Sequence, residues 1–227
     1  WMVHSFPTRR SSDLLFAAKA GRCLIADDMG LGKTIQAIAA CEILAQVSGV
    51  ERALVICPTA LKHQWKREIE RFVGRSATVI EGFRPTREDL YTAESFFKIT
   101  NYDTVQRDLD LINGWHPDVV ILDEAQRIKN WATRRAKAVK QVESDHAIVL
   151  TGTPLENRLE ELHSIMEFVD RFHLGPLFRF LAEHQHSDET GRVVGYKNLD
   201  GIKESLAPVL IRRRKQDHRS GSGGLIV

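Results

Sequence analysis

The sequence lacks the features of several protein classes. Its 227 residues include only three cysteines, Cys23, Cys41 and Cys57, which are far apart and form no CxxC pair. This argues against a disulfide framework and a cysteine metal site, and it predicts reduced, mostly buried thiols. No apolar run approaches the roughly 18 residues of a membrane span, and no secretory signal is evident. We therefore expect a cytoplasmic protein with no membrane partner.

A strong charge of either sign is also missing. The 32 Lys and Arg residues nearly balance 30 Asp and Glu residues, and the net charge of +2 indicates no class of partner. The fractions of hydrophobic residues (43%) and charged residues (27%) argue against wholesale disorder. This length and composition allow one domain, or one large domain with an insertion, to bury a core. His163, His173, His184 and His186 are not spaced as a metal site.

Both ends differ from the rest of the chain. Residues 4–14 read HSFPTRRSSDL, have no useful periodicity, and resemble the in-frame translation of a common sequencing adapter. We predict that residues 1–14 are an artefact, with a polar N-terminal arm as the alternative. Residues 220–227 read SGSGGLIV, which is typical of a disordered or artificial tail.

Short apolar segments rich in Val or Ile predict the strands. They are residues 23–26, 53–57, 77–80, 96–100, 118–122 and 147–150. Their apolarity is continuous and does not alternate, so we expect strands buried on both faces, as in a parallel sheet.

Helix patterns separate these strands. Residues 33–47 are mostly apolar, residues 61–73 are amphipathic, and apolar residues recur at helical spacing from Leu155 to Val169. Within 61–73, the residues expected near one face are Leu61, Trp65, Ile69 and Phe72. The alternation of strands and helices predicts an α/β fold with a three-layer domain, and residues 172–200 break this pattern.

A candidate phosphate-binding loop follows the first strand. Residues 27–34 read DDMGLGKT, and a helix pattern comes directly after them. Lys33 would meet the β- and γ-phosphates of a nucleotide, and the Thr34 hydroxyl would be a ligand of Mg²⁺. Asp27 stands where such loops have their first glycine, and a chance GKT turn is the alternative. The residues expected to bind ATP are Asp28, Met29, Gly30, Leu31, Gly32, Lys33 and Thr34.

Two carboxylates follow the fifth strand directly. A buried parallel strand over 119–122 would deliver Asp123 and Glu124 to its carboxyl end, beside the phosphate loop. Asp123 would then hold the Mg²⁺ shell, and Glu124 would deprotonate the attacking water. The alternative is an ordinary acidic cluster at a helix start.

Several segments in order resemble one family. The segments DDMGLGKTIQ (27–36), DEAQRIKN (123–130) and LTGTPLENRLEELHSIMEFV (150–169) together resemble the Swi/Snf-type ATPases, which are double-stranded-DNA translocases of helicase superfamily two. LVICPTALKHQW, ITNYDTV and LIRRRKQD look like further motifs of that family, and the sequence looks closest to bacterial members.

The resemblance implies a fold and the residue boundaries of its parts. It implies an α/β, RecA-like P-loop NTPase lobe, a mostly parallel β-sheet sandwiched by helices, over residues 15–171. Residues 172–219 would be a family-specific insertion and lobe-exit segment. ATP and Mg²⁺ would be the cofactors.

The resemblance also implies roles for single residues. Thr151, Gly152 and Thr153 would couple the γ-phosphate to lobe movement, and Gln126, where many relatives have His, would relay between them and the acidic pair. Residues expected to contact the DNA backbone are Pro58, Thr59, Asn101, Tyr102 and, from a locally basic segment, Lys62. The solvated face of an amphipathic helix is the alternative for that basic segment.

These observations predict a function, and they also predict that one part needed for it is missing. We expect the N-terminal, ATP-binding lobe of a DNA-dependent ATPase that translocates on double-stranded DNA without sequence specificity, associated with a bacterial nucleoid. Nothing after Asp217 resembles a second lobe with its arginine finger, so the isolated chain should be nearly inactive. Alternatives are an RNA helicase lobe, against which the TGTP segment argues, and a nucleotide-binding module that never hydrolyses.

Overall fold

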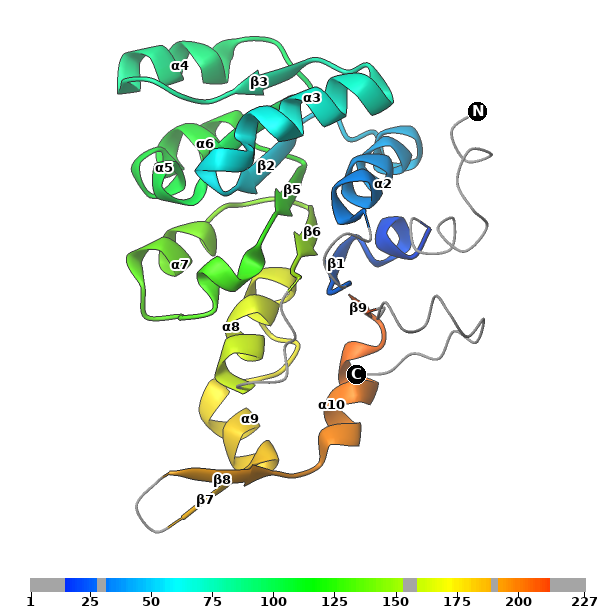
Figure 1. Cartoon of the computed structure of the whole chain (residues 1–227), viewed down its shortest axis with the longest axis vertical. Coiled ribbons are helices and arrows are strands. Elements are labelled where there is room, and N and C mark those ends of the chain that lie inside the picture. The colour runs from blue at the N-terminus through cyan, green and yellow to red at the C-terminus, as the bar shows by residue number, and fades with distance from the viewer. Residues whose placement is uncertain (1–14, 28–31, 153–158, 189–191, 213–227) are drawn as a thin grey trace.

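A single parallel sheet organises the computed structural model, which describes residues 15–27, 32–152, 159–188 and 192–212 (Figure 1). Its seven strands have the order β3-β4-β2-β5-β6-β1-β9, and every pairing between them is parallel. The strands are β1 (Arg22–Ile25), β2 (Ala53–Cys57), β3 (Ala77–Val79), β4 (Phe97–Asn101), β5 (Val119–Leu122), β6 (His146–Leu150) and β9 (Leu210–Ile211).

Helices cover both faces of this sheet. Successive strand residues point to opposite faces, so Leu54 and Ile56 enter one apolar core while Val55 and Cys57 enter the other. The second core is closed by α2 (Lys33–Ser48), α3 (Lys62–Val73) and the helical residues 15–20.

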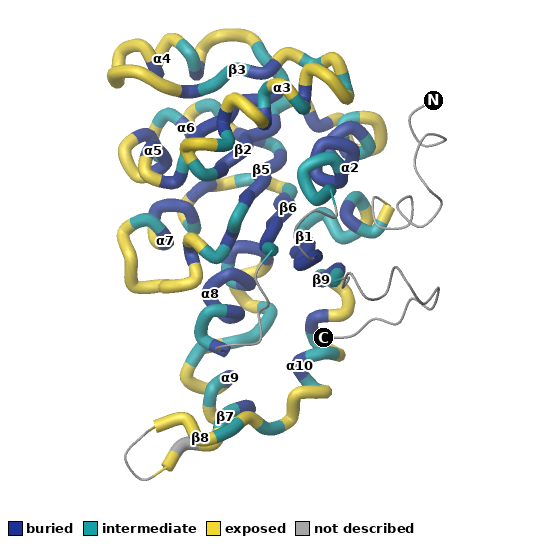
Figure 2. Tube along the Cα trace, in the orientation of Figure 1, coloured by how far each residue is buried: buried dark blue, intermediate teal, exposed yellow. Residues whose placement is uncertain are grey.

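The other core lies beneath more helices. They are α4 (Arg84–Thr92), α5 (Tyr102–Arg107), α6 (Leu109–Trp115), α7 (Arg134–Val139), α8 (Leu159–Val169), α9 (Leu177–His184) and α10 (Leu199–Leu206). Strands β1, β2, β5 and β6 are almost wholly buried between the two layers (Figure 2). This three-layer arrangement explains why their apolar runs are continuous.

The six predicted strands are confirmed to within a residue or so at their ends, but one strand was not predicted. Leu210 and Ile211 form β9, which pairs with Leu24 and Ile25 of β1 and adds an edge to the sheet. These two residues lie in the segment 172–219 that the resemblance predicts as an insertion and lobe exit. A two-residue strand is too short to show a pattern, so only its pairing identifies it.

A second difference concerns the buried face of α3. Trp65 and Ile69 are buried as predicted, but Phe72 is 40% exposed. Phe72 keeps the expected angular position, yet it lies in the last turn before Gly74 ends the helix with φ 65°. Periodicity gives the face of a residue but does not show whether a neighbouring element covers that turn.

The segment after α8 projects from the sheet. It contains α9 and an antiparallel hairpin of β7 (Gln185–Ser187) and β8 (Val193–Tyr196), which lies at the bottom of Figure 1. The helix predicted near 155–169 begins at Leu159 as far as the described residues show, because residues 153–158 lie outside them. The limits proposed for the insertion stay predictions.

Candidate functional site

Those predicted ATP-site residues that the structure describes gather at the carboxyl edge of the sheet. Since all seven strands of this sheet are parallel, the ends of β1, β5 and β6 lie at one edge. The charge of Lys33, at the end of the phosphate loop, acts on the Asp123 carboxyl, so the two groups lie near each other. The strand order places β6 between β1 and β5. Thr151, at the end of β6, lies between them.

The start of α2 forms one side of this edge. Gly32 precedes the helix with φ 78° and ψ 33°, a left-handed conformation that strains residues with a side chain. Lys33 Nζ donates to the carbonyl of Asp27 at 2.8 Å, and Thr34 follows in the first turn. The fully buried Asp27 accepts a hydrogen bond from Gln36 at 3.3 Å, which ties the loop to the helix. The predicted ATP contacts Asp28, Met29, Gly30 and Leu31 lie outside the described residues.

Asp123 is buried and held by two donors. Its Oδ2 accepts from Trp65 Nε1 at 2.8 Å, and its Oδ1 accepts from the Glu124 backbone N–H at 2.9 Å. Burial, together with the neighbouring Glu124 charge, raises the pKa of the Asp123 carboxyl, although the Trp65 bond and Lys33 act in the other direction. A desolvated carboxylate beside a second acid is an environment that a cation stabilises.

Glu124 has an uncommon backbone conformation. Its φ of 54° and ψ of 53° are left-handed, which is rare for a residue with a long side chain and which is found most often at functional sites. Its carboxylate accepts from the Gln126 amide, and the Thr151 hydroxyl donates to the Gln126 carbonyl at 3.2 Å. Three side chains thus connect the ends of β5 and β6. The coupling role of Gln126, Thr151 and Gly152 stays a prediction, and Thr153 lies outside the described residues.

The predicted DNA contacts occupy different environments. Thr59 is exposed in the 3₁₀ turn Thr59–Leu61, which Pro58 precedes. The Asn101 side chain caps α5 by accepting from the N–H groups of Asp103 and Thr104, both at 3.0 Å.

Two of these residues face inward. The buried Tyr102 hydroxyl donates to the Asp123 carbonyl at 2.7 Å, and the buried Lys62 ammonium donates to the Ile80 carbonyl at 3.2 Å and pairs with Glu81 at 3.3 Å. These contacts favour internal roles for both side chains, and the DNA contacts stay predictions.

Two partners of the site were not predicted. Trp65 was expected only on one face of an amphipathic helix, whereas its indole N–H reaches Asp123, and Gln36 was given no role. A buried tryptophan needs a partner for its N–H, which was the available signal. The identity of that partner depends on which strand lies beneath the helix.

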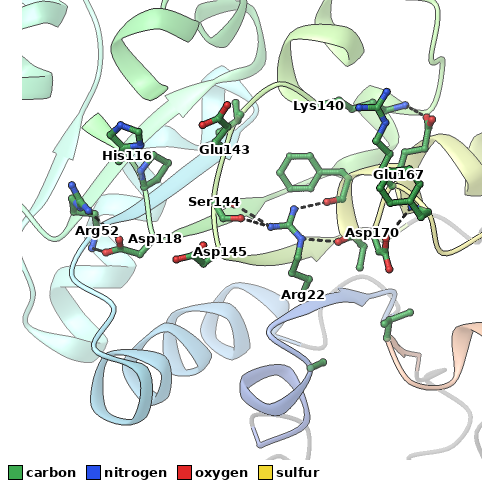
Figure 3. A pocket seen from close by; sticks show the side chains of 18 residues that line it. Arg22, Arg52, His116, Asp118, Lys140, Glu143, Ser144, Asp145, Glu167 and Asp170 are labelled. Carbon is green, nitrogen blue, oxygen red and sulfur yellow. Dashed lines mark hydrogen bonds and ion pairs between the residues drawn. The ribbon is translucent and has the colours of Figure 1, made fainter. Parts of the chain in front are cut away.

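A hollow of about 920 Å³ lies at the opposite edge of the sheet (Figure 3). Three of its cations already have partners: Arg22 donates to three backbone carbonyls, Arg52 pairs with Asp118, and Lys140 pairs with Glu167. We therefore do not treat it as the active site. Among the residues that the structure describes, no group of three or more His, Cys, Asp or Glu residues is placed to hold a metal ion, and no helix is long and apolar enough to span a membrane.

Comparison with known proteins identifies the family. The SNF2-related domain matches residues 9–222. The chain belongs to the SNF2-related family. The match begins within residues 1–14 and continues through all the segments described above.

Relatives and solved structures of SNF2-related proteins resemble the chain along most of its length. It is 35% identical over 212 residues to "Putative ATP-dependent helicase/translocase YwqA" of Bacillus subtilis (strain 168), covering 90% of this chain and 23% of that protein. It is 30% identical to "TATA-binding protein-associated factor MOT1" of Saccharomyces cerevisiae, covering 86% of this chain and 12% of that protein.

A solved structure shows the same fold. The "Sulfolobus solfataricus SWI2/SNF2 ATPase core in complex with dsDNA" matches with a TM-score of 0.78 and 29% identity, over 93% of this chain and 45% of that one. The prediction of a RecA-like lobe is thereby confirmed. The chain spans less than half of the length of each of these proteins.

Proposed function

We propose that this chain is the ATP-binding lobe of a DNA-dependent ATPase that translocates on double-stranded DNA. One observation carries the proposal: in an SNF2-related chain, the ends of β1, β5 and β6 bring Lys33, the acidic pair and Thr151 to one edge of the sheet. This combination has a cation for phosphate, carboxylates for a metal and water, and a hydrogen-bonded link from Glu124 through Gln126 to Thr151.

ATP would bind at the start of α2. The N–H groups of the first turn of a helix have no partners within the helix and favour phosphate, and Lys33 would add a cation to them. Thr34 and Asp123 would hold Mg²⁺, which neutralises charge on the phosphate oxygens when bound. The donor set fits this ion, because Asp123 is a buried carboxylate with a second acid next to it.

Glu124 is the proposed base for hydrolysis. Its left-handed backbone turns the residue away from the path of β5, and the Gln126 amide holds its carboxylate. From that position, the carboxylate would accept a proton from the attacking water. Gln126 carries no charge. Its role would be to position Glu124 and, through its hydrogen bond with Thr151, to couple the two residues.

DNA and a second lobe belong to the proposed whole protein. The solved SWI2/SNF2 ATPase core, of which this chain covers 45%, is described as in complex with dsDNA. This supports duplex DNA as the substrate of a longer protein. The groups proposed for contact are the Pro58–Thr59 turn and the basic side chains of α3. They would meet the phosphate backbone and so would not read sequence. A place at a bacterial nucleoid stays a prediction.

Titration with a fluorescent ATP analogue tests the nucleotide site. Lys33→Ala removes the cation proposed to meet the phosphates, and a charge-assisted contact is worth about 1.5–3 kcal/mol. The affinity should therefore fall by about ten- to a hundredfold. Lys66→Ala is the matched control, since the Lys66 side chain is 41% exposed on α3 and pairs with Glu70. Equal binding by the parent chain and Lys33→Ala would contradict the proposal.

A further inference from the structure

We infer that Trp65 is a positioning residue for the Mg²⁺ ligand Asp123, and that it connects α3 to the nucleotide site. The inference rests on the proposed function, because it assigns a role to a contact of the metal ligand. Its basis is the hydrogen bond of 2.8 Å between Trp65 Nε1 and Asp123 Oδ2, which joins residues 58 positions apart.

Burial gives this hydrogen bond its importance. Trp65 is 1% exposed and Asp123 is 8% exposed, so water competes little for either group. The indole N–H is a donor only, and its bond to a carboxylate is charge-assisted. Glu124 is the next residue, and its negative charge would repel the Asp123 carboxylate if that side chain could turn. The Trp65 bond opposes this rotation.

Two donors together define the orientation of the carboxylate. The Glu124 N–H holds Oδ1 and the Trp65 N–H holds Oδ2, and each oxygen keeps a second lone pair that can reach a metal. The Tyr102 hydroxyl also holds the Asp123 carbonyl at 2.7 Å, so the backbone is anchored as well as the side chain. A metal ligand held in this way needs little reorganisation when the ion binds.

Because of the position of α3, the hydrogen bond between Trp65 and Asp123 couples a movement of this helix to the metal ligand. The helix follows directly from the 3₁₀ turn Thr59–Leu61, whose Thr59 is exposed at the carboxyl edge. Trp65 lies one turn into α3, on the face that packs against the sheet. A shift of the 3₁₀ turn would therefore move the indole and, with it, the carboxylate of Asp123.

Trp65→Phe tests the role by removing the N–H while keeping an aromatic ring in the core. We expect the variant to bind a fluorescent ADP analogue without metal as the parent does. Its apparent Mg²⁺ dissociation constant, from titration of the analogue complex, should rise by about tenfold or more, as for other groups that orient metal ligands. Trp115→Phe is the matched control, because Trp115 is half-buried at the opposite edge of the sheet. It should leave both constants unchanged.

A second measurement uses the parent chain alone. The indole ¹⁵N–H resonance of Trp65 should shift when Mg²⁺ is added to the ADP complex. The resonance is identified by its loss in Trp65→Phe or, if that variant does not fold, by the slow solvent exchange of a buried N–H. A purely structural Trp65 would give no shift specific to Mg²⁺.

The outcomes separate the two proposals. If the parent binds ADP in a Mg²⁺-dependent manner while the Trp65 resonance does not move, or while Trp65→Phe keeps the parent's Mg²⁺ constant, the positioning role is wrong and the proposed function stands. If the parent shows no Mg²⁺-dependent binding, both are overturned.

Discussion

Gln126 shows how one side chain can link two motifs. Its amide N–H₂ donates to Glu124 and its carbonyl accepts from Thr151, so it uses both of its hydrogen-bonding groups. A neutral amide can do this at any pH, whereas an imidazole would change between donor and acceptor as it titrates. The resemblance predicted a relay at this position, and the structure provides the contacts for one.

Arg22 has a structural role at the edge of the sheet opposite the candidate site. Its guanidinium donates to the carbonyls of Val169 at 2.6 Å and Phe168 at 2.7 Å, which satisfies the carboxyl end of α8, and to the carbonyl of Ser144, just before β6, at 2.6 Å (Figure 3). Burial lowers the pKa of Arg22, but an arginine stays charged at neutral pH.

We predict that Arg22→Met destabilises the chain. The substitution leaves these carbonyls without their donor, at a cost of about 1–3 kcal/mol. For a chain of this size, each kcal/mol lowers the melting temperature by about 2–4 °C. Thermal unfolding followed by circular dichroism measures the change. Arg134→Met, which removes an exposed arginine of α7, should unfold near the parent temperature. A parent-like melting temperature for Arg22→Met would show that the three bonds contribute nothing net.

At the scale of elements, Lys98 connects a strand to a helix end. It lies in β4, is fully buried, and its ammonium donates to the carbonyls of Leu90 and Ala93, at 2.8 and 2.6 Å, where α4 ends. The ammonium is also 5.0 Å from the centroid of the Trp115 ring. Burial lowers the pKa of Lys98 to about 8. The buried Lys98 ammonium thus satisfies carbonyls at the end of α4, and burying its charge costs free energy.

We predict a pH dependence of stability from Lys98. The ordinary pKa of lysine is about 10.4. Below pH 8 both states are protonated, and the cost of burying the charge is fully present. Between about pH 8 and 10.4 the unfolded state holds a proton that the folded state has lost, so the free energy of unfolding rises with pH.

Comparison with Lys98→Met isolates this contribution. Urea unfolding at pH 7.5 and 10.5 should show the parent gaining stability relative to the variant, by on the order of 1 kcal/mol per pH unit across the window. Lys66→Met, at an exposed lysine of α3, should show no such relative gain. A constant difference between parent and Lys98→Met at both pH values would contradict the burial argument.

At the scale of the whole molecule, the chain resembles half of a motor. It covers 45% of the length of the SWI2/SNF2 core that it matches. The groups proposed for ATP, Mg²⁺ and water that the structure describes lie at one edge of one lobe. Related phosphoryl-transfer enzymes gain about 10³–10⁵ in rate from an arginine finger, and the motor proposed here would receive it from a second lobe.

We predict that this chain alone binds ATP but turns it over very slowly. Steady-state phosphate release, with and without duplex DNA, should be close to that of Glu124→Gln, in which the proposed base is lost. DNA should not accelerate it, because stepping requires two lobes that close around the nucleotide. Turnover on the order of one ATP per second with stimulation by DNA would show that a single lobe suffices.

Binding of DNA by the chain should be weak, sensitive to salt and indifferent to sequence. Contacts to phosphates release counterions, so the affinity should fall steeply as the salt concentration rises. Fluorescence anisotropy with two unrelated duplexes at two salt concentrations measures this. A strong preference for one duplex would require contacts to base edges that the proposal does not include.

The sequence by itself determined the layers and the chemistry of the site. Strands buried on both faces must be continuously apolar, so their positions are visible in the sequence, as 53–57 shows. Asp123 and Glu124 follow β5 directly, and Lys33 comes after the loop that follows β1. Parallel strands bring such residues to one edge whatever their order. These inferences depend only on local patterns.

Only the tertiary structure decided how the site is connected. The strand order puts β6 between β1 and β5, adds β9 to the edge, and sets α3 where Trp65 reaches Asp123. It also turns Lys62 and Tyr102 inward, although basic and aromatic residues at those positions suit a DNA surface equally well. The physical reason is that a side chain's partner depends on which elements become neighbours. Residues 58 positions apart share no local pattern that could reveal it.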